Sequence, residues 1–399
     1  MIYLDNASTT MIAPEVLDAM MPYLTYEYGN PGTLYDLGFS AKKAVEKARE
    51  QVAEFMGAES PEHIIFTSGG TESNNMVFNS YRISEEQRCK EENADKKGIV
   101  VSAIEHDSVL RAAGALTKSG FHVNHIGVHE DGRVYTAELD SLLASEATGL
   151  ASIMYVNNEV VSVNDIRKLA EVCHKHYCLL HSDCVQAAGC FGIQAKELGC
   201  DYMSISSHKI HGPKGVGALY VRDVEHIYPM ISGGASQEHG LRGGTENVAG
   251  IVGLGAACEF YNQGQAGQIE TRLKRVFWSE LHKRHYKELC NGRVRPMHDN
   301  AMSSLSQGKT LSVRFDGVDA EALVLLLGSR GVCISAGSAC SSHEQHPSHV
   351  LLGIGLTEAE ARSTVRFSFS RTNTENDVLA AARVVVESVQ DLLSGGAGN

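Results

Sequence analysis

The sequence contains no run of apolar residues approaching the roughly 20 that a membrane-spanning helix requires. It also lacks an excess of positive charge, since 35 Lys and Arg residues are outnumbered by 48 Asp and Glu residues, giving a formal net charge of −13. Without a basic stripe, direct binding to nucleic acid is not expected. Residues 1–5 show neither the charged nor the apolar segment of a secretion signal, which predicts a cytoplasmic protein or an already trimmed mature form.

The ten cysteines lack the spacing of a zinc or redox-dithiol site. None of them forms a C-x-x-C pair, so we predict no metal site and expect most of the thiols to be small buried side chains. Cys340 differs, because it lies within the small, polar segment 335–343, where a thiol can be exposed and can ionise. From these residues alone it is either a reactive thiol or an ordinary exposed cysteine.

Internal repeats and low-complexity segments are absent, and a chain of 399 residues is long enough for a large domain and a smaller one. From residue 64 onward, short apolar strands alternate with helical stretches, which predicts an α/β fold with a largely parallel sheet covered on both faces by helices. The expected strands are residues 64–67, 99–102, 152–156, 178–182 and 202–206. A smaller α/β unit is expected later, with strands at 310–315 and 364–369 and a helix at 320–329.

Four polar residues directly follow predicted strands of the large sheet. They are Thr71, His106, Asp183 and Lys209. In parallel sheets the carboxyl ends of the strands line the usual ligand crevice, so these side chains are expected to meet at one edge. This placement predicts a functional site without reference to any family.

Lys209 lies in the segment 206–217, between two apolar runs, beside hydroxyl groups, a histidine and a glycine-rich turn. A lysine held in such a place and partly desolvated can form a Schiff base with a carbonyl compound. The alternative is an ordinary surface turn that carries a lysine.

Gly70 and Thr71 open a predicted helix after a strand, so backbone N–H groups and the helix dipole can face an anion. The segment is not a P-loop, because the G-x-x-x-x-G-K-[ST] pattern is missing, and it is not a dinucleotide fingerprint. Taken alone, Thr71 is equally consistent with an ordinary helix N-cap.

These motifs occur together in the order known from one family. The segments concerned are 4–7, 68–73, 104–107, 156–159, 183–186, 206–217, 242–247, 335–343 and 366–368. The chain resembles the cysteine desulfurases that depend on pyridoxal phosphate, in the class V aminotransferase superfamily of fold type I. The resemblance extends nearly end to end, and its long Cys340 loop is similar to the nitrogen-fixation and iron–sulfur-cluster group.

The resemblance implies a large domain with a mostly parallel sheet of the seven-stranded type and a smaller C-terminal α/β domain. Residues 1–15 would form an arm against the small domain, 16–261 the large cofactor-binding domain, and 262–399 the small domain that carries Cys340. It also implies a homodimer, because Thr245 of one subunit would reach the cofactor phosphate of the other.

The resemblance assigns roles to the remaining residues of the predicted site. The cofactor phosphate would lie against Gly70, Thr71, Ser206 and His208. Asp183 would hold the pyridine nitrogen protonated, Gln186 would approach the ring oxygen, and His106 would stack on the ring and assist proton transfer. Lys209 would carry the cofactor and act as base, Asn158 would contact cofactor and substrate, and Arg366 would bind the substrate carboxylate.

The implied activity is conversion of L-cysteine to L-alanine, with a persulfide formed on Cys340. An acceptor protein would then receive the sulfur for iron–sulfur cluster assembly or thio-modification. Three departures from the family pattern are Tyr35, Val161 and Cys184. Because a tyrosine at position 35 is also similar to selenocysteine lyases, such a lyase or another class V enzyme is the alternative. The non-enzymatic alternative is a cofactor-free scaffold protein that only binds a sulfur acceptor.

Overall fold

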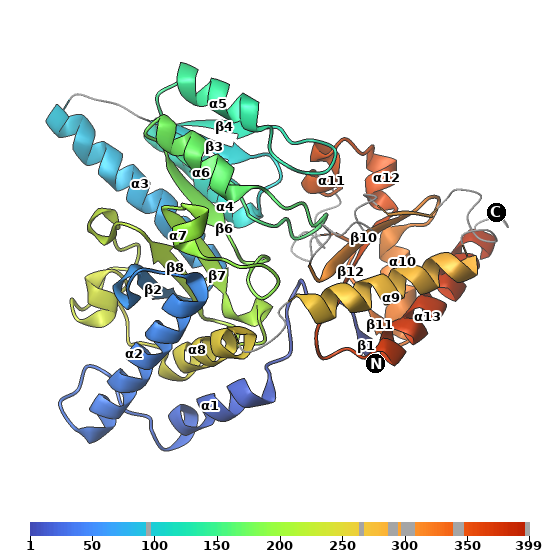
Figure 1. The fold of residues 1–399 in the computed structure, drawn as a ribbon, viewed down its shortest axis with the longest axis horizontal. Helices are drawn as coiled ribbons and strands as arrows, with labels where there is room; N and C mark the ends of the chain where they lie inside the picture. The colour runs from blue at the N-terminus through green and yellow to red at the C-terminus, as the bar shows by residue number, and fades with distance from the viewer. Residues whose placement is uncertain (93–96, 263–266, 286–293, 297–307, 338–346, 396–399) are drawn as a thin grey trace.

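The computed structural model describes residues 1–92, 97–262, 267–285, 294–296, 308–337 and 347–395, arranged as a larger and a smaller lobe (Figure 1). None of the helices in these ranges is both long enough and apolar enough to cross a membrane. The helices are α1 (Pro14–Thr25), α2 (Asp36–Met56), α3 (Gly70–Glu92), α4 (Asp107–Leu116), α5 (Thr136–Ser145), α6 (Ile166–Lys175), α7 (Ala195–Leu198), α8 (Val248–Asn262), α9 (Gln268–His285), α10 (Ala320–Ser329), α11 (His349–Gly353), α12 (Glu358–Arg362) and α13 (Glu375–Gly395).

A seven-stranded sheet in the order β2-β8-β7-β6-β5-β3-β4 forms the centre of the larger lobe. Only β8 is antiparallel to its neighbours, and the other pairings in this sheet are parallel. The sheet confirms the predicted α/β fold with a mostly parallel arrangement. Its strands are β2 (Ile64–Thr67), β3 (Gly98–Ser102), β4 (His122–Ile126), β5 (Thr148–Ser152), β6 (Leu179–Asp183), β7 (Tyr202–Ser206) and β8 (Gly217–Val221).

Alternating side chains of the strands bury apolar surface on both faces of this sheet. On β2, Ile64 and Phe66 belong to a core that includes residues of α1, α2, α6 and α8, whereas Ile65 belongs to a second core with residues of α3 and α4. Because both faces are covered, polar groups of the strands reach a cavity only where the strands end. The carboxyl edge of the sheet is therefore the place for a site.

The smaller lobe has its own apolar core, in which α9, α10 and α13 surround the antiparallel strands β12-β10-β9. Its strands are β9 (Val294–Pro296), β10 (Thr310–Phe315), β11 (Val332–Cys333) and β12 (Thr364–Ser368). Not every later residue belongs to this core, since Val350, Leu351, Ile354 and Ala361 pack into the core of the larger lobe. The division of the chain into domains at 15/16 and 261/262 stays a prediction.

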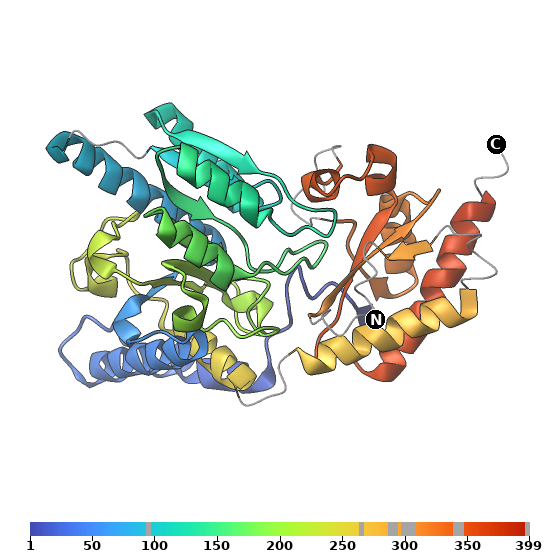
Figure 2. The ribbon, with the colours of Figure 1, turned by 45° about the horizontal axis from the view of Figure 1, so that its top comes forward.

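The N-terminal arm connects the two lobes, as the blue segment in Figure 2 shows. Strand β1 (Ile2–Tyr3) pairs in parallel with β11 of the smaller lobe, and Leu4 is fully buried in the smaller core. Further along, Thr10 donates its backbone N–H to the carbonyl of His208 in the larger lobe at 2.9 Å. The arm consequently passes the carboxyl edge of the large sheet.

Candidate functional site at the edge of the large sheet

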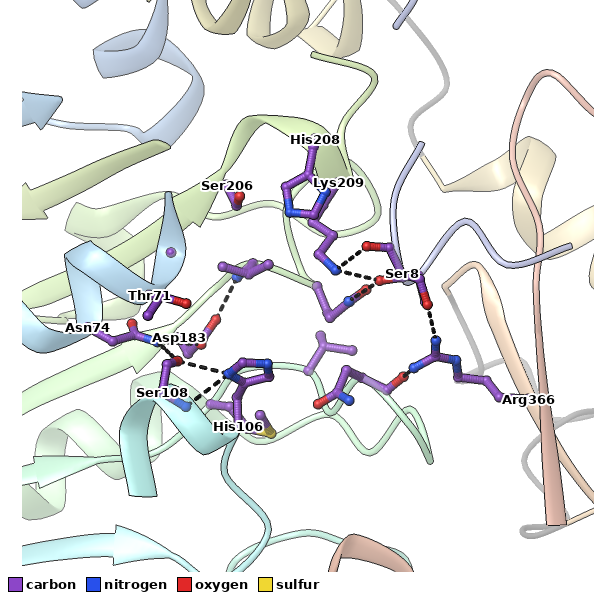
Figure 3. A pocket seen from close by; sticks show the side chains of 17 residues that line it. Ser8, Thr71, Asn74, His106, Ser108, Asp183, Ser206, His208, Lys209 and Arg366 are labelled. Atoms are coloured by element: carbon purple, nitrogen blue, oxygen red, sulfur yellow. Dashed lines mark hydrogen bonds between the residues drawn. The ribbon is translucent and has the colours of Figure 1, made fainter. Parts of the chain in front are cut away.

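A cavity of about 250 Å³ lies where the carboxyl ends of the large sheet's strands meet the N-terminal arm and β12 (Figure 3). The predicted residues that line it are Gly70, Thr71, His106, Asn158, Asp183, Gln186, Ser206, His208, Lys209 and Arg366. Two predicted residues are not among its lining. Thr245 is exposed in the segment that precedes α8, and Cys340 lies outside the described residues.

Asp183, the last residue of β6, is the carboxylate of the cavity and is 6% exposed. Its Oδ1 accepts the backbone N–H of Val185 at 2.9 Å, and its Oδ2 accepts from the Asn74 amide at 2.9 Å. The same amide nitrogen of Asn74 donates to Ser108 Oγ at 2.8 Å. The carboxylate is therefore held in one orientation by α3 and by the turn after β6.

His106 is the N-cap of α4, and its Nδ1 accepts the backbone N–H of Ser108 at 3.1 Å. The Ser108 hydroxyl lies 2.8 Å from the same Nδ1. Because Ser108 Oγ accepts from Asn74, its own hydrogen is directed to the histidine. Nδ1 is thus an acceptor, and the ring proton of neutral His106 is on Nε2.

Two ionisable side chains lie beneath the carboxylate and are fully buried. Burial lowers the pKa of His181 from 6.5 to about 4, although the charge of Asp183 acts in the opposite direction. Burial also raises the pKa of Glu105 well above its usual range, assisted by the negative charge of Asp183. The imidazole of His181 is therefore neutral at neutral pH, and burial disfavours the charged form of Glu105.

The end of the cavity at the start of α3 is suited to receive an anion. Gly70 begins the 23-residue helix α3, whose free N–H groups and dipole are directed at the cavity edge. A Cβ atom at Gly70 would lie 2.8 Å from Val185 Cγ2, so a larger residue would intrude on a side chain that lines the cavity. Thr71 and Ser206 add hydroxyl groups here.

His208 lies at the same end, in the short helix η3 (Ser207–Lys209) after β7. Burial, with the positive charges of Lys209, Lys214 and Lys309, lowers its pKa from 6.5 to about 4. The imidazole is therefore neutral at neutral pH, and its Nδ1 lies 3.1 Å from Thr9 Oγ1 of the arm. A neutral imidazole serves a phosphate as a hydrogen-bond donor and adds no positive charge.

Lys209 ends η3 and extends its amine into the cavity (Figure 3). Its Nζ donates to the backbone carbonyls of Ala7 and Ser8, each at 2.7 Å. The arm also accepts from the Gln186 amide, whose Nε2 lies 2.9 Å from the Ala7 carbonyl. The N-terminal arm thus orients both residues from its backbone.

Arg366 comes from the middle of β12 in the smaller lobe, and its side chain is 3% exposed. Its Nη2 donates to the Asp5 carboxylate at 3.0 Å and to Ser8 Oγ at 2.8 Å, and its Nη1 donates to the Asn158 carbonyl at 2.9 Å. Within the described part of the chain, its buried Nε has no hydrogen-bond partner. This orphaned donor fits a carboxylate placed in the cavity.

The arrangement fits pyridoxal phosphate in its chemistry. An amine, a fixed carboxylate and an anion-binding helix start line one cavity, which matches an aldehyde, a pyridine nitrogen and a phosphate. Sequence reasoning missed Ser8, Asn74 and Ser108 at this site. Asn74 had a usable signal, because it follows Thr71 by three residues and helical spacing places both on one face.

Comparison with known proteins assigns the family. The chain matches the class-V aminotransferase family over residues 2–380. The chain belongs to this family. A curated relative from Methanosarcina thermophila, named cysteine desulfurase IscS, is 38% identical over 392 residues, covering 98% of this chain and 92% of the relative. The resemblance predicted from the sequence is confirmed.

Solved structures agree with this membership of the class-V aminotransferases. A structure titled NIFS-like protein superimposes with a TM-score of 0.86 at 34% identity, covering 98% of this chain and 100% of its own. Another, titled SspA in complex with cysteine, gives a TM-score of 0.76 at 34% identity, with 92% and 99% coverage. The fold predicted as fold type I is therefore shared with both structures, of which the second was solved in complex with cysteine.

Proposed function

We propose that this protein is a pyridoxal-phosphate-dependent cysteine desulfurase that converts L-cysteine to L-alanine and collects the sulfur as a persulfide on Cys340. The observation that supports it most is the meeting of Lys209, Asp183 and Arg366 in one cavity that also opens on the start of α3. Relatives named cysteine desulfurase cover nearly the whole chain.

Pyridoxal phosphate, when bound, supplies an electron-poor ring that stores the electron pair left when the substrate Cα loses its proton. Asp183 would accept a hydrogen bond from the protonated ring nitrogen, and Asn74 keeps its carboxylate in place. Lys209 would hold the cofactor through its aldehyde and would serve as the base for the substrate Cα proton, taken up on Nζ. Thr71, Ser206, His208 and the N-terminus of α3 would hold the phosphate, and His106 and Gln186 would contact the ring and its oxygen.

Arg366 binds the carboxylate of L-cysteine through its free Nε and orients the substrate against Asn158. The contacts from Asp5 and Ser8 already fix the plane of the guanidinium, so little side-chain entropy is lost when the substrate binds. The thiol of Cys340 then attacks the substrate sulfur. The carbon–sulfur bond breaks, Cys340 keeps the sulfur, and an acceptor protein in the cytoplasm receives it for cluster assembly or thio-modification.

The active unit in this proposal is a homodimer. Thr245 is exposed and does not line its own cavity, which is consistent with a contact to the phosphate of a second copy. Large apolar side chains are also exposed on α1 and on the segment that leads into α2, and a second copy would cover such a surface. They include Leu24, Tyr26, Tyr28, Leu34 and Phe39. Residues 1–15, 16–261 and 262–399 are the proposed arm, large domain and small domain.

Mass spectrometry after incubation with L-cysteine tests the proposal. Wild-type protein loaded with pyridoxal phosphate is expected to gain one sulfur atom on Cys340 and to release alanine, and Cys340→Ala is expected to do neither. Cys333→Ala, a cysteine of β11, is the matched control and should behave as wild type. If alanine is released but no sulfur is found on Cys340, the desulfurase proposal is wrong and the alternative of a class V lyase applies.

The cofactor itself is tested by borohydride trapping. Reduction of the loaded protein is expected to attach the phosphopyridoxyl group to the Lys209 peptide, and Lys209→Ala should remain unlabelled. A wild-type protein that takes up no pyridoxal phosphate would contradict the enzyme and leave the scaffold interpretation.

A further inference from the structure

A second lysine contacts the backbone of Lys209 from the other lobe. Lys309 immediately precedes β10, is 5% exposed, and its Nζ donates to the backbone carbonyl of Lys209 at 2.9 Å. Lys309 belongs to none of the motifs recognised in the sequence, and the proposed chemistry does not use it. A buried lysine is costly unless its charge is used or compensated, so its presence here requires an explanation.

The surroundings of Lys309 compensate its charge only in part. Burial lowers its pKa, and the positive charge of Arg366 acts in the same direction, whereas Cys190 and Glu270 act against it. The Glu270 carboxylate is 1% exposed and also lies 3.8 Å from Nε of Arg371, so more than one cation shares this negative group. Glu270 therefore has at least two cationic side chains near it, Lys309 and Arg371.

The charge of Lys309 acts on both sides of Lys209 in the chain. Lys309 is among the positive groups that, together with burial, lower the pKa of His208 to about 4. It also contributes, after burial, to the lowering of the pKa of His211 to about 4, against the hydrogen bond that His211 Nδ1 makes to the Met11 carbonyl. Because Lys309 Nζ lies 2.9 Å from the backbone carbonyl of Lys209, the side chain of Lys209 extends from a backbone that carries the same neighbouring cation.

We propose that Lys309 is a positioning residue for Lys209, which holds the Lys209 backbone by its hydrogen bond and disfavours a second positive charge on the Lys209 amine. A neutral amine is the form that attacks an aldehyde, and a neighbouring cation is a known means of keeping a lysine neutral near pH 7. Lys309 thus prepares Lys209 to capture pyridoxal phosphate.

Other groups near the Lys209 amine favour its charged form, and Lys309 acts against their effect. The carbonyls of Ala7 and Ser8 accept from it and favour its charged form, as does the carboxylate of Asp183 in the same cavity. The positive groups nearby include Arg366, which lines the cavity, Lys309 and Lys214, and the histidines His106 and His208 line the same cavity. Without Lys309, the acceptors on the arm would favour the charged form of the Lys209 amine with less opposition.

The test measures how fast full-length apo-protein captures pyridoxal phosphate as a function of pH. Samples are reduced with borohydride at timed intervals, and the label on the Lys209 peptide is quantified by mass spectrometry. The capture rate rises as the amine loses its proton, so its midpoint reports the pKa of Lys209. The wild-type midpoint is expected well below the ordinary lysine value of about 10.4.

Two substitutions separate charge from hydrogen bonding. Lys309→Gln keeps an amide donor for the Lys209 carbonyl but removes the charge, and it is expected to raise the midpoint by about one pH unit. Lys309→Met removes both, so the same shift is expected together with a lower plateau rate at high pH. Lys274→Met, which removes another buried lysine of α9, is the matched control and should leave the midpoint unchanged.

The result that overturns this inference is a Lys309→Gln midpoint equal to that of wild type, or a shift of the same size in Lys274→Met. A wild-type midpoint at the ordinary lysine value would overturn it as well, without any variant. The inference rests on the proposed function, since it takes Lys209 as the residue that captures the cofactor. If wild-type protein forms no adduct at Lys209, the proposed function fails, whereas normal capture with unshifted midpoints contradicts the role of Lys309 alone.

Discussion

The side-chain amide of Asn74 donates to Asp183 Oδ2 at 2.9 Å, one helical turn after the start of α3. Neither atom is accessible from outside, because Asn74 is 1% and Asp183 is 6% exposed. The helix α3, whose start we propose as the phosphate site, therefore also carries the group that orients the Asp183 carboxylate. In the proposed complex, one rigid helix would position both the phosphate and the carboxylate that meets the ring.

Asn74→Ala should weaken cofactor binding about tenfold, because a buried carboxylate oxygen loses its donor at a cost of about 1–3 kcal/mol. The measurement is the dissociation constant for pyridoxal phosphate, obtained by titrating apo-protein and following absorbance. Asn79→Ala, five residues further along the same helix, provides the control and should leave the constant unchanged. An Asn74→Ala protein that binds as tightly as wild type would show that Asp183 needs no such support.

Arg366→Lys should raise KM for L-cysteine by at least about tenfold, with a smaller change in kcat, because a point charge cannot replace the planar fork that meets a carboxylate. Steady-state kinetics of alanine formation measure this. Arg314→Lys is the control. Arg314 lies on the neighbouring strand β10, pairs with the carboxylates of Asp316 and Glu360, and does not line the cavity. Equal losses in both variants would indicate a general effect on the smaller lobe.

His181 should make the protein less stable in acid. Its pKa is about 4 in the folded protein against an ordinary value of 6.5, so only the unfolded chain binds this proton between those values. The contribution is complete above pH 6.5 and is lost as the pH falls towards 4. From pH 7 to about pH 5 it lowers the free energy of unfolding by about 2 kcal/mol.

Denaturant unfolding of apo-protein at the two pH values checks this expectation in wild type and in His181→Gln. The variant should lose about 2 kcal/mol less than wild type over the same interval. His122→Gln, at an exposed position of β4, should keep the full wild-type loss. Identical pH dependence in wild type and His181→Gln would mean that His181 is protonated in the folded protein.

Arg49→Met should destabilise the protein by about 3–5 kcal/mol, because it leaves the Glu238 carboxylate buried without its cation. The two side chains are 3% and 4% exposed, their closest contact is 2.7 Å, and Glu238 also accepts the backbone N–H of Phe66. The check is the free energy of unfolding in denaturant. Arg82→Met breaks the more exposed pair with Glu86 and should cost less than about 1 kcal/mol.

The sequence predicted strands well where polar residues bound an apolar run, as in β7 and β10. The strand expected at 152–156 is instead β5 (Thr148–Ser152), because the run continues beyond the strand into the loop that leads to Asn158. Strand β4 was not expected at all. It is an edge strand with exposed histidines at 122 and 125, so it lacks the apolar run of a buried strand.

The sequence predicts those residues of the candidate site that directly follow a strand of the large sheet. Thr71, His106, Asp183 and Lys209 meet because parallel strands end at one edge, and the sequence alone shows that rhythm. The contacts of the arm and of Lys309 were not predictable, because they join residues about 200 and 100 positions apart through backbone carbonyls, which carry no sequence signal.

Residues 4–8 belong structurally to both lobes at once. Leu4 fills the smaller core, Asp5 is the counter-ion of Arg366, and the carbonyls of Ala7 and Ser8 receive the Lys209 amine. A product that began after Ser8, through internal initiation or proteolytic trimming, would retain every strand of the large sheet and the helices that cover its two faces. It would nevertheless lose the contacts that orient Arg366 and Lys209 together, so an intact first segment is a quality criterion for any preparation used to measure activity.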